Sequence, residues 1–206
     1  MAKIDFIYFD LGKVIFDFDH QIGCEQVACL AGLKPEQVRV ALFDSGLEVR
    51  YETGLLNCEE FHAEFCQATG SPIGQRDLLE SMSDIFTPNR EMFPLLTQLR
   101  AVNFPIGILS NTCRAHWSHV FERYTVMRKF FAPLILSYEV NSMKPDSVIY
   151  HRAIEMAGCS NKTVFFVDDK QENVDGAIAA GMDAVLYRSV PELVEQLVAR
   201  GVEINL

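Results

Sequence analysis

The chain has 206 residues, of which 49% are hydrophobic, and it carries a formal net charge of −10 at pH 7. This length and apolar fraction suit one α/β domain, or a core domain with a modest insert. The acidic balance argues against a nucleic-acid-binding protein, which needs a basic face to displace counterions from phosphates.

The N-terminus and the cysteines bear on where the protein works. The opening stretch MAKIDFIYFD is punctuated by Asp5 and Asp10, and its apolar part is too short for a signal peptide. No apolar run reaches the roughly 18 residues of a membrane span. The six cysteines show no CxxC spacing, so we expect reduced, mostly buried thiols in a cytoplasmic protein. A monomer and a homodimer both stay open.

Short apolar runs of strand length recur along the chain. They are Ile4–Phe9, Pro105–Leu109, Pro133–Leu136, Val164–Val167 and Ala184–Tyr187. Helical patterns separate the later runs: PDSVIYHRAIEMAG opens with Pro145, which suits a first helical turn, and ENVDGAIAAG stops at Gly181. Strands that alternate with helices predict an α/β, Rossmann-like fold, with a parallel sheet and helices on both faces.

The stretch 19–87 breaks this alternation and has consecutive helical patterns. Within it, NCEEFHAEFCQATG places Asn57 and Glu60 at capping-box spacing and ends at Gly70. We therefore expect a small helical cap domain at 19–87, inserted after the first strand, and a core domain made of 1–18 and 88–206. Ligands of open α/β sheets bind at the carboxyl ends of the strands, so this insert would cover the site.

Polar side chains follow the predicted strands or precede a predicted helix. They are Asp10, Ser110, Asn111, Thr112, Lys144, Asp168, Asp169 and Asn173. Each alone has an ordinary explanation, such as a helix N-cap or a turn. Two adjacent acids, however, cost energy unless a cation compensates them. Together these residues place a nucleophile-like acid, a hydroxyl, a cation and paired acids at one edge of one sheet.

The order and context of FDLGKV, ILSNT, MKPD and VFFVDDKQENVDGA resemble the haloacid dehalogenase superfamily of hydrolases, over essentially the whole chain. The helical insert resembles the four-helix (C1-type) cap of that superfamily. DLGKV, ETGLLNCEEF and LSNTCRAHW are most similar to a bacterial subgroup that includes α-D-glucose-1-phosphate phosphatases and also has Gly at the position of Gly12. The resemblance implies a Mg²⁺-dependent phosphatase whose substrate is a small phosphorylated metabolite, first of all a sugar phosphate.

The resemblance also implies a role for each motif residue. Asp10 would be the nucleophile that forms an aspartyl-phosphate. Phosphate binding and charge neutralisation would fall to Ser110, the backbone of Asn111, Lys144 and Gly12. The Mg²⁺ ligands would be Asp10, the carbonyl of Gly12 and Asp169, with Asp168 and Asn173 supporting the metal indirectly or through water.

Gly12 stands where most phosphatases of the superfamily carry an Asp that protonates the leaving oxygen, which is worth about 10²–10⁴-fold in rate. Three consequences stay open. The substrate can have a leaving group that needs little protonation; Asp17, Asp19 or His20 can substitute; or the protein is slow and mainly binds phosphorylated ligands. His116 and Trp117, in RAHWSH, are expected to belong to a packed helix face and not to contact substrate.

Two other functions compete with a phosphatase. A 2-haloacid dehalogenase also uses an Asp nucleophile without the second acid, but it needs no metal. The pair Asp168–Asp169 speaks against it, because uncompensated negative charge would oppose binding of a haloacid carboxylate. The third hypothesis is a non-enzymatic protein that binds a phosphorylated ligand, and Gly12 is the only residue that supports it.

Overall fold

The computed structural model describes residues 3–204 and contains a five-stranded parallel sheet of order β5-β4-β1-β6-β7. The strands are β1 (Phe6–Phe9), β4 (Ile106–Ser110), β5 (Leu134–Leu136), β6 (Val164–Asp168) and β7 (Asp183–Leu186). Each coincides with a predicted apolar run, shifted by no more than two residues at an end, so the predicted α/β parallel-sheet fold is confirmed. Runs such as FIYF and VFFV are apolar throughout because these strands are buried on both faces.

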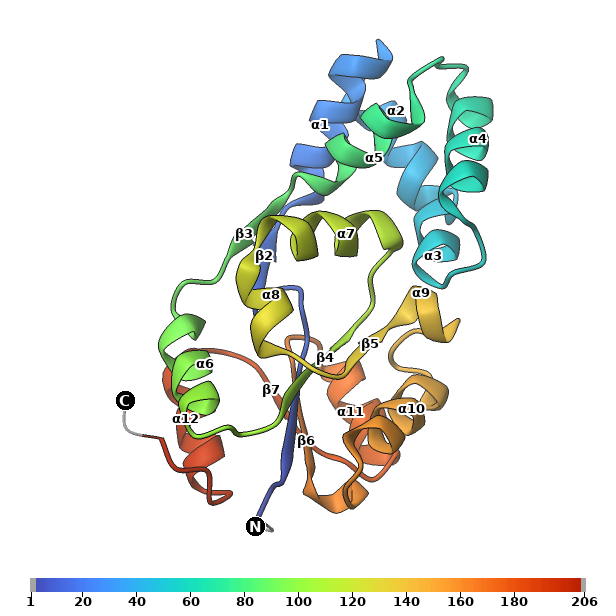
Figure 1. Ribbon diagram of the computed structural model, residues 1–206. Coiled ribbons are helices and arrows are strands. Elements are labelled where there is room, and N and C mark those ends of the chain that lie inside the picture. Colours follow the sequence, from blue (N-terminus) through green and yellow to red (C-terminus); the bar gives the residue numbers. More distant parts are fainter. Residues whose placement is uncertain (1–2, 205–206) are drawn as a thin grey trace.

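Helices cover both faces of the sheet (Figure 1). Alternate residues of β1 define the two layers: Ile7 and Phe9 pack in one hydrophobic cluster, Phe6 and Tyr8 in another. The first cluster takes in helices α6 (Met92–Ala101), α7 (Arg114–Arg123), α8 (Thr125–Phe130) and α12 (Val190–Val198). The second takes in α10 (Ser147–Ala157) and α11 (Gln171–Ala179). Two short elements adjoin the strands: α9 (Ser137–Val140) follows β5, and the 3₁₀ turn η2 (Asn161–Thr163) precedes β6.

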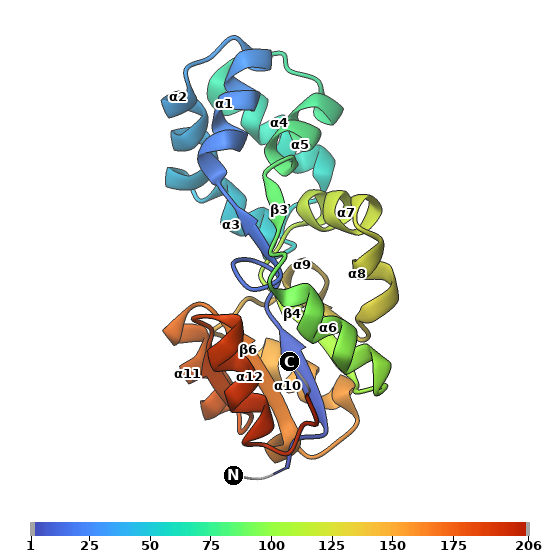
Figure 2. The same cartoon turned by 90° about the vertical axis from the view of Figure 1, so that its left-hand side faces the viewer.

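A separate group of helices stands over the carboxyl end of the sheet, as Figures 1 and 2 show. It comprises α1 (His20–Ala31), α2 (Pro35–Arg39), the π-helical turn η1 (Val40–Asp44), α3 (Leu47–Glu52), α4 (Cys58–Thr69) and α5 (Gln75–Ser83). These helices enclose their own hydrophobic cluster, in which Val27, Phe61 and Phe65 are fully buried. The predicted helical cap after the first strand is therefore confirmed.

The cap joins the core through an antiparallel ribbon of β2 (Phe16–Phe18) and β3 (Phe86–Pro88). This ribbon was not predicted, because strands of three residues are too short to show an alternating pattern. The capping box of α4 is present as predicted: the Asn57 side chain accepts from the N–H of Glu60, and the Glu60 carboxylate accepts from the N–H of Asn57.

One predicted helix start is wrong. Pro145 does not occupy the first turn of α10; it precedes the N-cap, Asp146. The Asp146 carboxylate accepts a hydrogen bond from the N–H of Val148 at 2.8 Å and caps a helix that begins at Ser147, two residues after Pro145.

Two further properties concern the chain as a whole. No helix within residues 3–204 combines the length and hydropathy that a membrane span requires. All six cysteines carry free thiols, and Cys24 and Cys113 are buried.

Candidate active site at the carboxyl edge of the sheet

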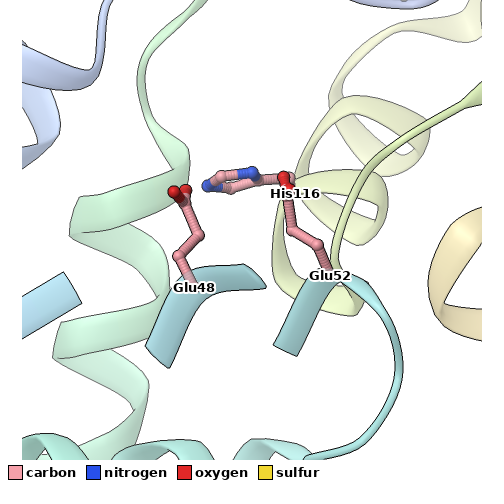
Figure 3. Close-up of side chains that lie close together, drawn as sticks. All are labelled: Glu48, Glu52 and His116. Carbon is pink, nitrogen blue, oxygen red and sulfur yellow. The ribbon is translucent and has the colours of Figure 1, made fainter. Parts of the chain in front are cut away.

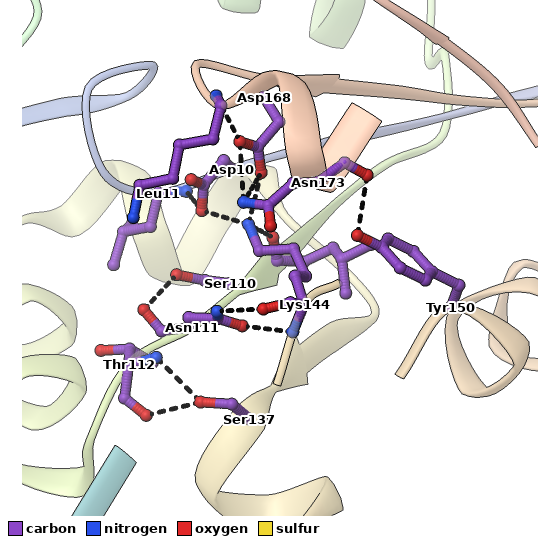
Figure 4. Close-up of polar contacts among 12 residues, drawn as sticks. Asp10, Leu11, Ser110, Asn111, Thr112, Ser137, Lys144, Tyr150, Asp168 and Asn173 are labelled. Carbon is purple, nitrogen blue, oxygen red and sulfur yellow. Dashed lines mark hydrogen bonds and ion pairs between the residues drawn. The ribbon is translucent and has the colours of Figure 1, made fainter. Parts of the chain in front are cut away.

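Three neighbouring strands bring the predicted polar residues to one place. Asp10 follows β1, Ser110 ends β4 and Asp168 ends β6. Because β1 pairs in parallel with both β4 and β6, these ends lie side by side at the same edge of the sheet (Figure 4). Asp10 and Ser110 are buried, with 8% and 1% of their surface exposed, so this edge is largely shielded from solvent.

Lys144 is the centre of the site. Its ammonium contacts Asp10 Oδ1 at 2.9 Å and Asp168 Oδ2 at 2.6 Å, and it donates to the carbonyl of Leu109 at 3.0 Å. The side chain is 1% exposed. Burial lowers the pKa of Lys144, but Asp10 and Asp168 outweigh that effect and hold its pKa above the ordinary value. The lysine is therefore a fixed positive charge beside Asp10.

Asp10 is oriented by two donors. Its Oδ1 accepts from the N–H of Leu11 at 2.7 Å in addition to the Lys144 contact. Burial raises the pKa of Asp10 to about 7, and the ammonium of Lys144 opposes that rise. The carboxylate thus has a fixed orientation, and 12% of its side chain stays exposed.

Asp168 holds Lys144 in place. Besides the lysine, it accepts from the amide of Asn173 at 3.0 and 3.1 Å and from the N–H of Lys170 at 2.8 Å. Asn173 is fixed in turn by Tyr150, whose hydroxyl donates to its carbonyl at 2.7 Å. Both oxygens of Asp168 are therefore occupied by the protein, whereas Asp169 is only partly buried.

Asn111 fixes the loop that carries Lys144. Its side chain donates to the Lys144 carbonyl at 2.9 Å and accepts from the Lys144 N–H at 2.8 Å. Thr112, the next residue, donates its N–H to the hydroxyl of Ser137 at 2.9 Å. The side chains after β4 thus serve to hold this edge together, which the sequence did not indicate for Thr112 or Ser137.

Gly12 is required by space and not by backbone conformation. A Cβ on Gly12 would lie 2.6 Å from Cε1 of Phe18, closer than real carbon contacts allow. The Phe18 ring also packs against His20 and Phe86, with ring centroids 4.9 and 5.9 Å away. An aromatic ring therefore occupies the volume into which a side chain at position 12 would project.

The residues considered as substitutes for the missing acid have other partners. Asp19 is the N-cap of α1 and accepts from the N–H of Gln21 at 2.8 Å. Asp17 is exposed and lies 3.9 Å from Lys13. The ring of His20 packs between Phe18 and Phe43.

Two groups of side chains have the composition of a cation site. Carboxylate oxygens of Asp10, Asp168 and Asp169 lie within 4.8 Å of one another. The second group, which the sequence analysis missed, is Glu48, Glu52 and His116 (Figure 3). The available signal was the i, i+4 spacing of Glu48 and Glu52, which puts both on one face of α3. The expectation that His116 and Trp117 lie in a packed helix face agrees with their burial, since they are 3% and 7% exposed.

Comparison with known proteins defines the class. The family model of the haloacid dehalogenase-like hydrolases matches residues 73–187, more than half of the chain. The chain belongs to this family and is therefore a hydrolase.

Individual relatives agree with that class. Pyrimidine 5'-nucleotidase YjjG of Escherichia coli (strain K12) is 28% identical over 191 residues, which cover 87% of this chain and 84% of the nucleotidase. Glyceraldehyde 3-phosphate phosphatase of Methanothermobacter thermautotrophicus is 24% identical, covering 89% and 85% of the two chains. Among solved structures, HAD family enzyme BT-2542 of Bacteroides thetaiotaomicron, in complex with magnesium and inorganic phosphate, aligns with a TM-score of 0.78 at 23% identity, over 91% of this chain and 96% of that one. The last similarity concerns the fold.

Proposed function

We propose that this hydrolase is a Mg²⁺-dependent phosphatase of a small phosphorylated metabolite and that it works through an aspartyl-phosphate on Asp10. The observation that carries the proposal is the buried ammonium of Lys144, 2.9 Å from Asp10 and 2.6 Å from Asp168. Attack by a carboxylate on a phosphate brings two anions together, and a fixed cation between them offsets that repulsion. The phosphatase and nucleotidase relatives support the same class of reaction.

The chemistry divides into two displacements. In the first, an oxygen of Asp10 forms a bond to phosphorus while the bond from phosphorus to the leaving oxygen breaks, and the leaving oxygen takes up a proton. In the second, a water oxygen attacks phosphorus, the bond to Asp10 breaks, and phosphate and the free carboxylate are regenerated. We assign the binding of the phosphoryl oxygens beside Lys144 to Ser110 and the backbone N–H of Asn111, which lie at the end of β4.

The donor set at this edge fits a magnesium ion. Mg²⁺ prefers oxygen ligands, and the oxygens of Asp10, Asp168 and Asp169 lie within 4.8 Å of one another. We assign Asp10, Asp169 and the carbonyl of Gly12 as ligands. Asp168, whose oxygens are taken by the protein, supports them indirectly. When bound, the ion supplies positive charge to the phosphoryl group.

The substrate belongs to the phosphorylated small metabolites, with sugar phosphates first. The cap over the sheet edge suits a compact substrate enclosed between two domains. We place the boundaries of the cap at 19–87, next to the ribbon of β2 and β3 that joins it to the core.

Phosphate release tests the proposal. The purified protein is assayed on sugar, nucleotide, acyl and amino-acid phosphates, with Mg²⁺ and with EDTA, alongside Asp10→Asn. Mg²⁺-dependent release that is lost in the variant supports the phosphatase. Chloride release from 2-chloropropionate without phosphate release would establish the dehalogenase. Binding of a phosphorylated ligand with no turnover of any compound would establish a ligand-binding protein.

A further inference from the structure

Glu48, Glu52 and His116 form a cluster that the proposed reaction has not yet used. The two glutamates lie one turn apart on α3, the histidine comes from α7, and their ligand atoms lie within 4.8 Å of one another. Figure 3 shows both carboxylates directed toward the His116 ring. Within residues 3–204, neither carboxylate takes part in a side-chain hydrogen bond, although Glu48 is only 7% exposed; His20 Nδ1 lies 3.8 Å from Glu48 Oε1. A carboxyl group with little exposure and no hydrogen-bond partner calls for an explanation, and a catalytic role or a bound ligand is one.

Glu52 is attached to the edge of the sheet that carries the candidate active site. Its carbonyl accepts a hydrogen bond from the hydroxyl of Ser137 at 2.6 Å. Ser137 follows Leu136, the residue of β5 that is paired with Ser110 of β4. The cap residue is thus fixed next to the strand end that presents Ser110.

The residues after Glu52 approach the core equally closely. The hydroxyl of Thr53 contacts Sδ of Met143 at 3.0 Å, and Met143 precedes Lys144. At Gly54, with φ +77°, a Cβ would lie 2.3 Å from the carbonyl oxygen of Tyr138, so only glycine fits. The contacts of Thr53 and Gly54 together hold the C-terminal end of α3 against the core.

The charges around Glu52 come from both domains. Burial raises the pKa of Glu52 to about 7; Lys170 lowers it, Asp10 raises it and Lys144 lowers it. These core residues act on Glu52 because its backbone is hydrogen-bonded to Ser137 at the edge of the sheet, which brings the carboxyl group within electrostatic range of Asp10 and Lys144. A carboxyl group that titrates near neutrality is suited both to donate and to accept a proton.

The other two members of the cluster sit behind Glu52. Burial, together with the Glu52 charge, raises the pKa of Glu48 to about 9, so Glu48 is neutral at pH 7. Burial lowers the pKa of His116 to about 3, with His20 adding to that effect, so the imidazole is also neutral. His116 Nε2 lies 3.2 Å from the carbonyl of Met82, to which it donates. Glu48 and His116 therefore add no charge beside Glu52 at pH 7.

We propose that Glu52 is the proton donor and acceptor for the leaving group, so that the cap supplies the acid that Gly12 lacks. The inference rests on the proposed phosphatase function. As an oxygen of Asp10 bonds to phosphorus, the bond to the leaving oxygen breaks and the proton of Glu52 passes to that oxygen. In the second displacement, the Glu52 carboxylate takes a proton from the attacking water, whose oxygen bonds to phosphorus as the bond to Asp10 breaks.

A divalent cation is the other occupant that this donor set could take. The structure favours proton exchange, because the cavity beside Glu48 has a volume of only about 10 Å³ and includes the apolar side chains of Leu42, Phe43 and Met82 in its lining. That volume holds at most one water, so a hydrated ion has no room there. Mg²⁺ keeps several waters in most protein sites, so it needs more volume than this cavity provides.

The test compares leaving groups. Glu52→Gln removes the proton and retains the size of the side chain, and Glu59→Gln, on the exposed surface of α4, is the matched control. Values of kcat/KM are measured for a sugar phosphate, p-nitrophenyl phosphate and acetyl phosphate. We expect Glu52→Gln to lose about 10²–10⁴-fold on the sugar phosphate but less than about tenfold on the other two, whose leaving oxygens need no proton. Glu59→Gln should match the wild type on all three.

Three results would overturn the inference. An equal loss on all three substrates would show that Glu52 has a structural role only. Wild-type rates in Glu52→Gln would show that Glu52 has no role in the reaction. Binding of two Mn²⁺ or Zn²⁺ ions per wild-type chain and of one per Glu52→Gln chain would identify a metal site. Failure of the wild type to release phosphate, with Asp10→Asn as its reference, would instead reject the phosphatase itself.

Discussion

Replacing Lys144 with Met tests the electrostatic reasoning at the site most directly. The substitution keeps an unbranched apolar stem of similar length and removes the three contacts of the ammonium, to Asp10 (2.9 Å), Asp168 (2.6 Å) and the Leu109 carbonyl (3.0 Å). The carboxylates of Asp10 and Asp168 then remain without the ammonium at a buried site, where the lysine side chain is 1% exposed and that of Asp168 is fully buried. Removing one partner of a buried ion pair costs about 3–5 kcal/mol, chiefly because the other partner stays uncompensated.

The remaining hydrogen bonds limit that magnitude. Asp168 keeps the Asn173 amide and the N–H of Lys170, and Asp10 keeps the N–H of Leu11. We therefore expect Lys144→Met to lower the free energy of unfolding by about 3–5 kcal/mol and to abolish turnover. Urea denaturation at pH 7 in EDTA measures the change, and an unchanged m-value confirms that the extent of unfolding is the same.

Two further variants make the result specific. Lys129→Met, on the exposed surface of α8, should change stability by less than about 0.5 kcal/mol. The double variant Lys144→Met/Asp168→Asn should be less destabilised than the sum of its single changes, because the second substitution removes one uncompensated carboxylate. A loss below about 1 kcal/mol for Lys144→Met, or strict additivity in the double variant, would refute the account of the site as a coupled buried ion triad.

Three other outcomes follow from the structure. Gly12→Ala should lower the free energy of unfolding by about 1–3 kcal/mol in urea denaturation, because its Cβ would lie 2.6 Å from Phe18, and adding Phe18→Ala should relieve that clash; an unchanged stability would contradict the role of the ring. Glu48→Gln should raise stability at pH 8 by on the order of 2 kcal/mol: burial raises the pKa of Glu48 from 4.5 to about 9, so the wild type loses stability as pH rises through that window, and the difference, followed by thermal unfolding from pH 4 to 9, should vanish near pH 4. Ser137→Ala should cost about 1–3 kcal/mol, because the hydroxyl bonds the carbonyl of Glu52, and should speed hydrogen exchange at the Thr112 N–H; retention of both properties would show that this bond does not hold the cap to the core.

The sequence by itself determined the layered fold. Runs such as FIYF and VFFVD are apolar at every position, which only a strand buried on both faces requires, and helical patterns with caps separate them. Parallel order brings the carboxyl ends of β1, β4 and β6 to one edge, so the sequence alone identifies Asp10, Ser110 and Asp168 as neighbours. The capping box of α4 was also predictable from the sequence, because its two partners, Asn57 and Glu60, are three residues apart.

Only the tertiary structure decided how the site is completed. That Phe18 fills the space beside Gly12, that both oxygens of Asp168 are occupied by protein donors, and that Glu52 descends from the cap beside Ser137 are all contacts between separate elements. The reason is physical: hydrophobic periodicity and capping depend on residues within a few positions of each other, whereas the approach of the cap to the core depends on how side chains from distant segments pack. The sequence shows that residue 12 has no side chain, and the fold shows that Glu52 of the cap is hydrogen-bonded to the edge of the sheet beside Ser110.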